Sequence, residues 1–161
     1  MNKNYWPIGI FLLAMVVVGL IVLTIKTALT NPVEMKGMCG MDSQYVDENI
    51  NTITQKRQAF LKQYAINFEG AKEQSINEFK MAFLRVKNLE NQKIQNNAKI
   101  TFFLTRPNTT QEDQKLGAGE LVDGIYQSPA FEVKKQGRWQ VEAYVEVGED
   151  FICLMQEYLV K

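Results

Sequence analysis

The residues with the clearest chemical potential form one short cluster, Met35-Lys36-Gly37-Met38-Cys39-Gly40-Met41. Thioethers and thiols are soft ligands that select Cu(I), so Met35, Met38, Cys39 and Met41 are candidate ligands for this ion. Methionine is also an adaptable packing residue, and the glycines loosen the chain, so the same cluster suits contact with a partner protein. The composition supports both interpretations, and base rates favour the partner contact.

A second cysteine, Cys153, offers Cys39 a different role. Two cysteines in a domain outside the cytoplasm favour a disulfide. Closing a loop of more than about 100 residues stabilises the fold by up to about 4.7 kcal/mol in the entropic model. A bridged Cys39 is lost as a thiolate ligand, so the disulfide and copper hypotheses compete. A free Cys153, buried as a small apolar residue, is the remaining alternative.

The composition excludes several classes of function. The 161 residues include no histidine, the commonest general base, zinc ligand and haem ligand. A Ser-His-Asp triad, a zinc protease site and a c-type haem are therefore excluded, and no cluster of acids or thiols suggests another enzyme. The 18 basic and 18 acidic residues cancel, so nothing attracts a nucleic acid. We expect a non-enzyme without a small-molecule substrate.

The elements that must position these residues begin with an apolar run from Pro7 to Ile25. If this run is helical, with a rise of about 1.5 Å per residue, it covers the roughly 30 Å of a bilayer core. It therefore predicts a transmembrane anchor in contact with lipid. Tyr5 and Trp6 precede it, where aromatic side chains prefer the headgroup layer, and Lys3 and Lys26 flank it. A cleaved secretory signal is the competing interpretation, although the apolar core is longer than usual for one.

The domain organisation follows from this single apolar run. We expect an N-terminal segment and transmembrane helix over residues 1–30, a juxtamembrane segment and helix over 31–64, and a soluble domain over 65–161. Lysines on the two sides of the helix are too evenly balanced to orient it. Asp42 and Ser43 are plausible N-caps for a helix over residues 43–64.

The remaining sequence predicts an antiparallel β-sandwich. Candidate strands cover 65–69, 77–89, 100–105, 131–134, 139–147 and 151–160, and glycine-containing turns at Gly137 and Gly148 separate the last three. The 76–90 stretch is ambiguous and also reads as a helix. The expected fold class is mainly β, with one transmembrane helix, a short soluble helix and an immunoglobulin-like sandwich.

The order of these parts resembles the FixH/CcoH family. The resemblance rests on Pro32 and Val33 after the anchor, and on a series of short motifs: Asp42-Ser43-Gln44-Tyr45-Val46-Asp47, Thr105-Arg106-Pro107 with Asp113, Asp123-Gly124-Ile125-Tyr126, and Gly137-Arg138-Trp139. Each motif is weak alone, but their order behind one anchor covers essentially the whole chain. A long helical stretch over 49–64 departs from the family pattern and is a candidate partner contact.

The resemblance implies a role beside cbb-type cytochrome c oxidase, the haem-copper terminal oxidase of Gram-negative bacteria. It implies an inner-membrane protein with a cytoplasmic N-terminus, a periplasmic sandwich and no cofactor of its own. Its partners would be oxidase subunits, with the chain acting as a resident subunit or an assembly factor. The shared residues have a structural explanation too, because Pro107 can end a strand and Trp139 can fill the core.

Two other hypotheses remain open from the sequence. One is a periplasm-facing Cu(I) chaperone for oxidase maturation, centred on the Met35–Met41 cluster. The other is an unrelated anchored scaffold or sensor of the envelope. A fold does not identify a function, so the site has to distinguish these hypotheses.

Overall fold

The computed structural model describes residues 5–30, 35–70 and 72–161, so Lys3, Pro32 and Val33 lie outside the described residues. The chain divides into two compact units, Met1–Glu34 and Met35–Lys161. The segment over 35–63 thus belongs to the same unit as the strands that follow it.

The first unit contains helix α1, Trp6–Thr30. Its described side chains are all exposed, although almost all of them are apolar. It is the one helix among the described residues that is long and apolar enough to cross a membrane. A membrane anchor, surrounded by lipid, and a secretory signal, removed after export, both have an apolar surface of this kind, and both fit this helix.

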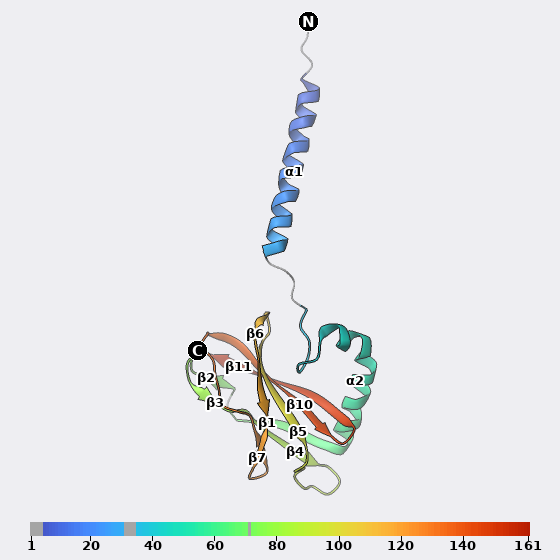
Figure 1. Ribbon diagram of the computed structural model, residues 1–161, viewed down its shortest axis with the longest axis vertical. Coiled ribbons are helices and arrows are strands. Elements are labelled where there is room, and N and C mark those ends of the chain that lie inside the picture. Colours follow the sequence, from blue (N-terminus) through green and yellow to red (C-terminus); the bar gives the residue numbers. More distant parts are fainter. Residues whose placement is uncertain (1–4, 31–34, 71) are drawn as a thin grey trace. The chain divides into compact units, whose positions relative to one another are not determined.

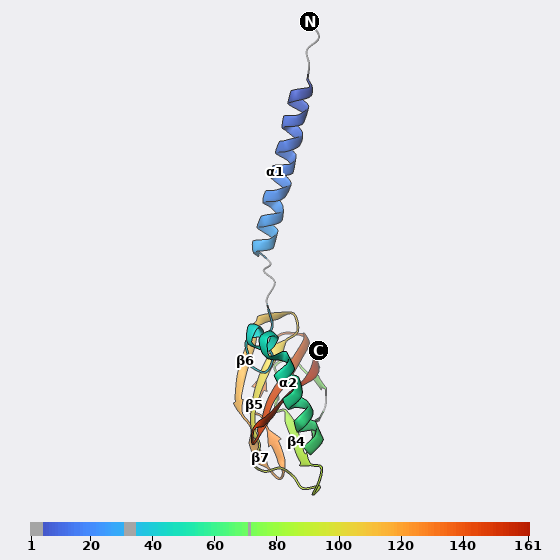
Figure 2. The ribbon, with the colours of Figure 1, turned by 90° about the vertical axis from the view of Figure 1, so that its right-hand side faces the viewer.

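The second unit begins with helix α2, Ser43–Gln63. The Asp42 side chain accepts a hydrogen bond from the Gln44 backbone N–H at 3.1 Å, as expected of an N-cap. The helix lies against strand β11 and leads directly into β1 (Figures 1 and 2). Of its apolar residues, Ile53 and Phe60 are buried, and Phe60 joins the core of the sandwich.

Strands β1 to β11 follow helix α2 in the described part of this unit. They are β1 (Tyr64–Glu69), β2 (Glu73–Gln74), β3 (Phe79–Lys80), β4 (Phe83–Asn88), β5 (Lys99–Arg106), β6 (Thr109–Ala118), β7 (Glu120–Val122), β8 (Ile125–Gln127), β9 (Phe131–Glu132), β10 (Gly137–Val147) and β11 (Asp150–Val160).

Two main sheets form from these strands. One has the order β1-β4-β8-β7 and the other β2-β11-β10-β5-β6, while β3 and β9 pair separately. The pairs are antiparallel except for the two-residue contact of β2 with β11. Apolar side chains of both sheets meet in one core, and Leu84, Phe102 and Val141 are fully buried there. The predicted fold class, a mainly β immunoglobulin-like sandwich behind two helices, is confirmed.

Several details differ from the expectation. The stretch over 77–89 is extended, but it forms β3 and β4 rather than one strand. Ala82 and Leu84 in this stretch are buried, and Phe79 is 71% exposed. The predicted strand over 131–134 is paired only at Phe131–Glu132. Gly137 is the first residue of β10 instead of a turn residue. Strands β2, β6, β7 and β8 were not predicted, because β6 is polar and has no buried residue and the other three are short.

Candidate functional site

The Met35–Met41 cluster folds into a tight turn against the second sheet. Met38 and Met41 exchange backbone hydrogen bonds, with N···O distances of 3.2 and 2.9 Å. Cys39 and Gly40 occupy the two central positions with positive φ angles of 50° and 76°. A Cβ at Gly40 would lie 2.6 Å from the Phe103 ring, so only glycine fits there. The turn therefore presents Cys39 in a conformation that side-chain contacts must hold.

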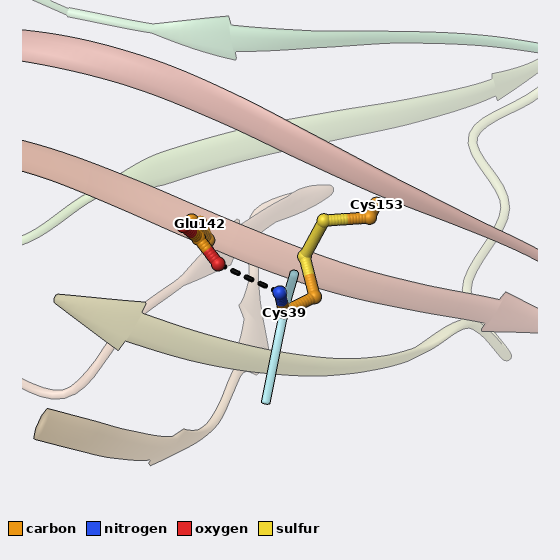
Figure 3. A group of neighbouring side chains, drawn as sticks. All are labelled: Cys39, Glu142 and Cys153. Atoms are coloured by element: carbon orange, nitrogen blue, oxygen red, sulfur yellow. Dashed lines mark hydrogen bonds between the residues drawn. A yellow bond between two sulfur atoms is a disulfide. The ribbon is translucent and has the colours of Figure 1, made fainter. Parts of the chain in front are cut away.

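A disulfide provides the first of these contacts. Cys39 is bonded to Cys153 of β11, with their Cα atoms 5.9 Å apart (Figure 3). The Cys39 residue is only 4% exposed. The bridge removes the thiolate from the candidate Cu(I) ligand set, so only the thioethers of Met35, Met38 and Met41 remain. Met35 is 79% exposed, and Met38 and Met41 are half-buried.

A buried carboxylate provides the second contact. Glu142 of β10 is 2% exposed, and its Oε2 accepts a hydrogen bond from the Cys39 backbone N–H at 2.7 Å (Figure 3). Its Oε1 accepts one from the Thr105 hydroxyl at 3.1 Å. The Lys36 Nζ lies 3.4 Å from Oε1 and donates to both Thr105 Oγ1 and Gln140 Oε1. These donors and the lysine compensate the desolvation of the carboxylate.

Glu142 and Gln140 were not identified as site residues from the sequence. Alternation along β10 places Trp139 and Val141 in the core and therefore Gln140 and Glu142 on the opposite face, which normally faces solvent. The folded segment around Cys39 covers that face instead. A contact between residues about 100 positions apart leaves no local pattern that predicts it.

These residues bring three metal-ligating groups together. The Cys39 Sγ, the Cys153 Sγ and a Glu142 carboxylate oxygen all lie within 4.8 Å of one another. Glu142, Gly37 and Gly40 also line an open cavity of about 340 Å³, together with Lys36, Asp42 and Lys115. The chemistry available here depends on the oxidation state of the two sulfurs, because a disulfide is a poor ligand and a thiolate a strong one.

The family-pattern residues around Arg106 border this site, because the Lys36 Nζ donates to the Arg106 carbonyl at 3.3 Å and Asp113 lines the same cavity. The Arg106 guanidinium lies 5.0 Å from the Trp139 ring centroid and donates to Glu112 at 2.9 Å. Its backbone N–H donates to Asp113 Oδ1 at 3.1 Å. Hydrogen bonds lower the pKa of the Glu112 carboxyl, with the larger effect from Lys135 and a smaller one from Arg106. Pro107 follows the last residue of β5, where its missing N–H breaks no pairing.

The other family-pattern residues form turns and core. Asp123 and Gly124 make the two-residue turn between β7 and β8, both with positive φ. The Tyr126 hydroxyl donates to the Gln95 carbonyl and accepts from the Ala98 N–H, and burial raises its pKa. Gly137 has a φ of 115°, and Trp139 is buried. The predicted interface residues Tyr5 and Trp6 are exposed at the start of α1.

The family model described as FixH matches residues 3–155, which is nearly the whole chain. The chain belongs to the FixH family. The family that the motifs predicted is thus confirmed, and the FixH family is associated with cbb-type cytochrome c oxidase. The matched region includes α1, the Cys39 turn, the first main sheet and the second as far as residue 155 of β11.

Solved structures with a related arrangement are more distant. A superoxide reductase (neelaredoxin) T24K from Ignicoccus hospitalis is 12% identical, with a TM-score of 0.42 over 62% of this chain and 82% of that chain. A CARDB domain from Pyrococcus furiosus, in complex with di-metal ions, is 15% identical, with a TM-score of 0.38 over 61% and 87%. These likenesses are too weak to indicate a function for the FixH-family chain. No curated protein matches its sequence.

Proposed function

We propose that this protein is a non-catalytic accessory component of a cbb-type cytochrome c oxidase, which it binds and stabilises as a subunit or an assembly factor. The observation that carries the proposal is the match of the FixH model to residues 3–155. A match to one domain would leave the anchor unexplained, whereas this match spans the apolar helix and the sandwich together.

The sequence composition supports a non-catalytic role. No histidine is present, and the family-pattern residues Arg106, Tyr126 and Trp139 serve an ion pair, hydrogen bonding and core packing. Glu142 is held by Lys36 and by hydrogen bonds that a structural carboxylate needs. A domain of this kind contributes surfaces instead of reacting groups.

We further propose that α1 remains as an anchor in the bacterial inner membrane, with the N-terminus cytoplasmic and the sandwich periplasmic. The disulfide supports this orientation, because disulfides persist in the periplasm and are rare in the cytoplasm. Fusion of alkaline phosphatase to the C-terminus tests it, since that enzyme is active only outside the cytoplasm. An inactive fusion that is present at normal abundance would contradict the orientation.

Deletion of the gene tests the accessory role. We expect membranes of the deletion strain to contain less assembled cbb-type oxidase, measured as c-type and b-type haem on native gels. The full chain should restore the oxidase, whereas a variant lacking residues 1–30 but exported by a cleavable signal should not. Unchanged oxidase in the deletion strain would contradict the proposed function.

The Cys39–Cys153 disulfide argues against the Cu(I) chaperone hypothesis. That hypothesis needs the Cys39 thiolate beside Met35, Met38 and Met41, and that sulfur is bonded to Cys153. Met35 lies three residues before Met38, the first residue of the turn, and its side chain is 79% exposed. The three methionines are therefore better explained as packing or contact residues.

A further inference from the structure

We propose that Cys39, Cys153 and Glu142 form a redox-gated binding site for a thiophilic divalent metal ion such as Zn²⁺. The disulfide keeps the site closed, and its reduction to two thiols opens it. The proposal is independent of the association with an oxidase, because it rests only on the geometry of these three residues.

The distances suit a metal centre of this kind. Zinc takes thiolate ligands at about 2.3 Å and carboxylate oxygens at about 2.0–2.2 Å, so tetrahedral ligand atoms lie roughly 3.5–3.8 Å apart. The two sulfurs and a Glu142 oxygen are already within 4.8 Å of one another. Breaking the S–S bond lets the sulfurs separate to that spacing while Cys153 stays on β11 and Glu142 on β10, which are neighbouring strands.

The surroundings of Glu142 orient it as a ligand. Its oxygens accept hydrogen bonds from the Cys39 backbone N–H and the Thr105 hydroxyl, and Lys36 lies beside them. Metal-binding carboxylates are held in this way, because fixed orientation reduces the cost of binding. Glu142, Gly37 and Gly40 line an open cavity of about 340 Å³, so an ion can approach the carboxylate from solvent.

The charges favour a divalent ion over a monovalent one. Two thiolates and the Glu142 carboxylate carry three negative charges, and Lys36 contributes one positive charge. A divalent cation makes the buried cluster neutral, whereas Cu(I) leaves one negative charge uncompensated. A thiol must lose its proton to become a metal ligand, so binding of the ion is coupled to proton release.

The redox step is a two-electron reduction. The S–S bond breaks, and each sulfur gains one electron and one proton. In the cell the reductant is a protein dithiol that becomes a disulfide; in vitro a phosphine is oxidised to its oxide, with water supplying the oxygen and the protons. Binding of the metal then displaces both thiol protons to solvent.

Titration of the full chain in mild detergent with Co²⁺ under anaerobic conditions tests the proposal. We expect the phosphine-reduced chain to bind one Co²⁺ with a thiolate-to-cobalt charge-transfer band, and Zn²⁺ to displace it. The oxidised chain should bind none at this site. A reduced chain without the band, or an equal affinity in the Cys39→Ser/Cys153→Ser variant, would overturn the proposal.

Glu142→Gln tests the carboxylate, and Glu146→Gln is the matched control because Glu146 lies four residues along the same face of β10. Reduced Glu142→Gln should bind Co²⁺ at least about tenfold more weakly, whereas Glu146→Gln should bind it like the wild type. Equal Co²⁺ affinity for the wild type and Glu142→Gln would mean that the carboxylate is not a ligand, which would overturn the proposed three-residue site. If Glu142→Gln does not fold, Glu142→Asp provides the same comparison, because it keeps the charge and withdraws the oxygens.

Discussion

Removing the Cys39–Cys153 disulfide should strongly destabilise the second unit. The bridge joins residues 114 positions apart, for which the chain-entropy model gives a loss of about 4.8 kcal/mol in the Cys39→Ala/Cys153→Ala variant. For a domain of about 130 residues this corresponds to a fall in Tm of roughly 15–20 °C. Urea unfolding followed by circular dichroism, in metal-free buffer, measures the free energy of unfolding directly.

The same variant also separates global from local effects. Without the bridge, the hydrogen bond from the N–H of residue 39 to Glu142 has to hold the turn, so hydrogen exchange should show reduced protection around residues 38–41 before the sandwich unfolds. A free-energy change below about 1 kcal/mol, with protection retained, would refute the reasoning. It would mean that the turn is held by Glu142 and α2 alone and that the bridge constrains little in the unfolded chain.

Three further predictions follow from packing, charge and pH. Phe102→Ala should cost about 3–5 kcal/mol of unfolding free energy, while Phe79→Ala, at a 71% exposed position, should cost less than about 0.5, as compared by urea midpoints. Lys36→Met should lower the free energy of unfolding by about 2 kcal/mol, because it leaves the Glu142 carboxylate buried without its cation. In a double-mutant cycle, adding Glu142→Gln should recover part of that loss, and strictly additive losses would contradict the prediction. Burial raises the pKa of Tyr158 to about 12, whereas the pKa in the unfolded chain is about 10, so the free energy of unfolding should fall as the pH rises from about 10 towards 12. Tyr158→Phe should make this fall smaller in urea unfolding at pH 9 and 11, and an unchanged fall would refute the prediction.

Much of the fold could be predicted from local patterns. The apolar run gave α1, the Asp42 cap gave the start of α2, and the alternation from Trp139 to Val147 gave β10. Each of these signals depends on residues close together in the chain, where periodicity records which face is buried. Strand β6 lacks that signal, because it lies at the end of its sheet and exposes most of its polar side chains.

The candidate site could be predicted only in part. Cys39 and Cys153 drew attention because the chain has just two cysteines, and their pairing was one of three alternatives. Glu142 carries no sequence signal, because its burial depends on a distant segment that covers the outer face of β10. The family resemblance came from the order of turn and core residues such as Gly124 and Trp139, which specify the fold and lie outside the site.

Purification of the membrane-bound chain through a C-terminal affinity tag tests the accessory role most directly. In mild detergent, the account predicts that subunits of a cbb-type oxidase co-purify, with the absorption of c-type and b-type haem in the eluate. A constant ratio of haem to chain would identify a resident subunit, and a low ratio with immature oxidase an assembly factor. Recovery of the chain alone, without haem, from membranes that contain the assembled oxidase would contradict the account.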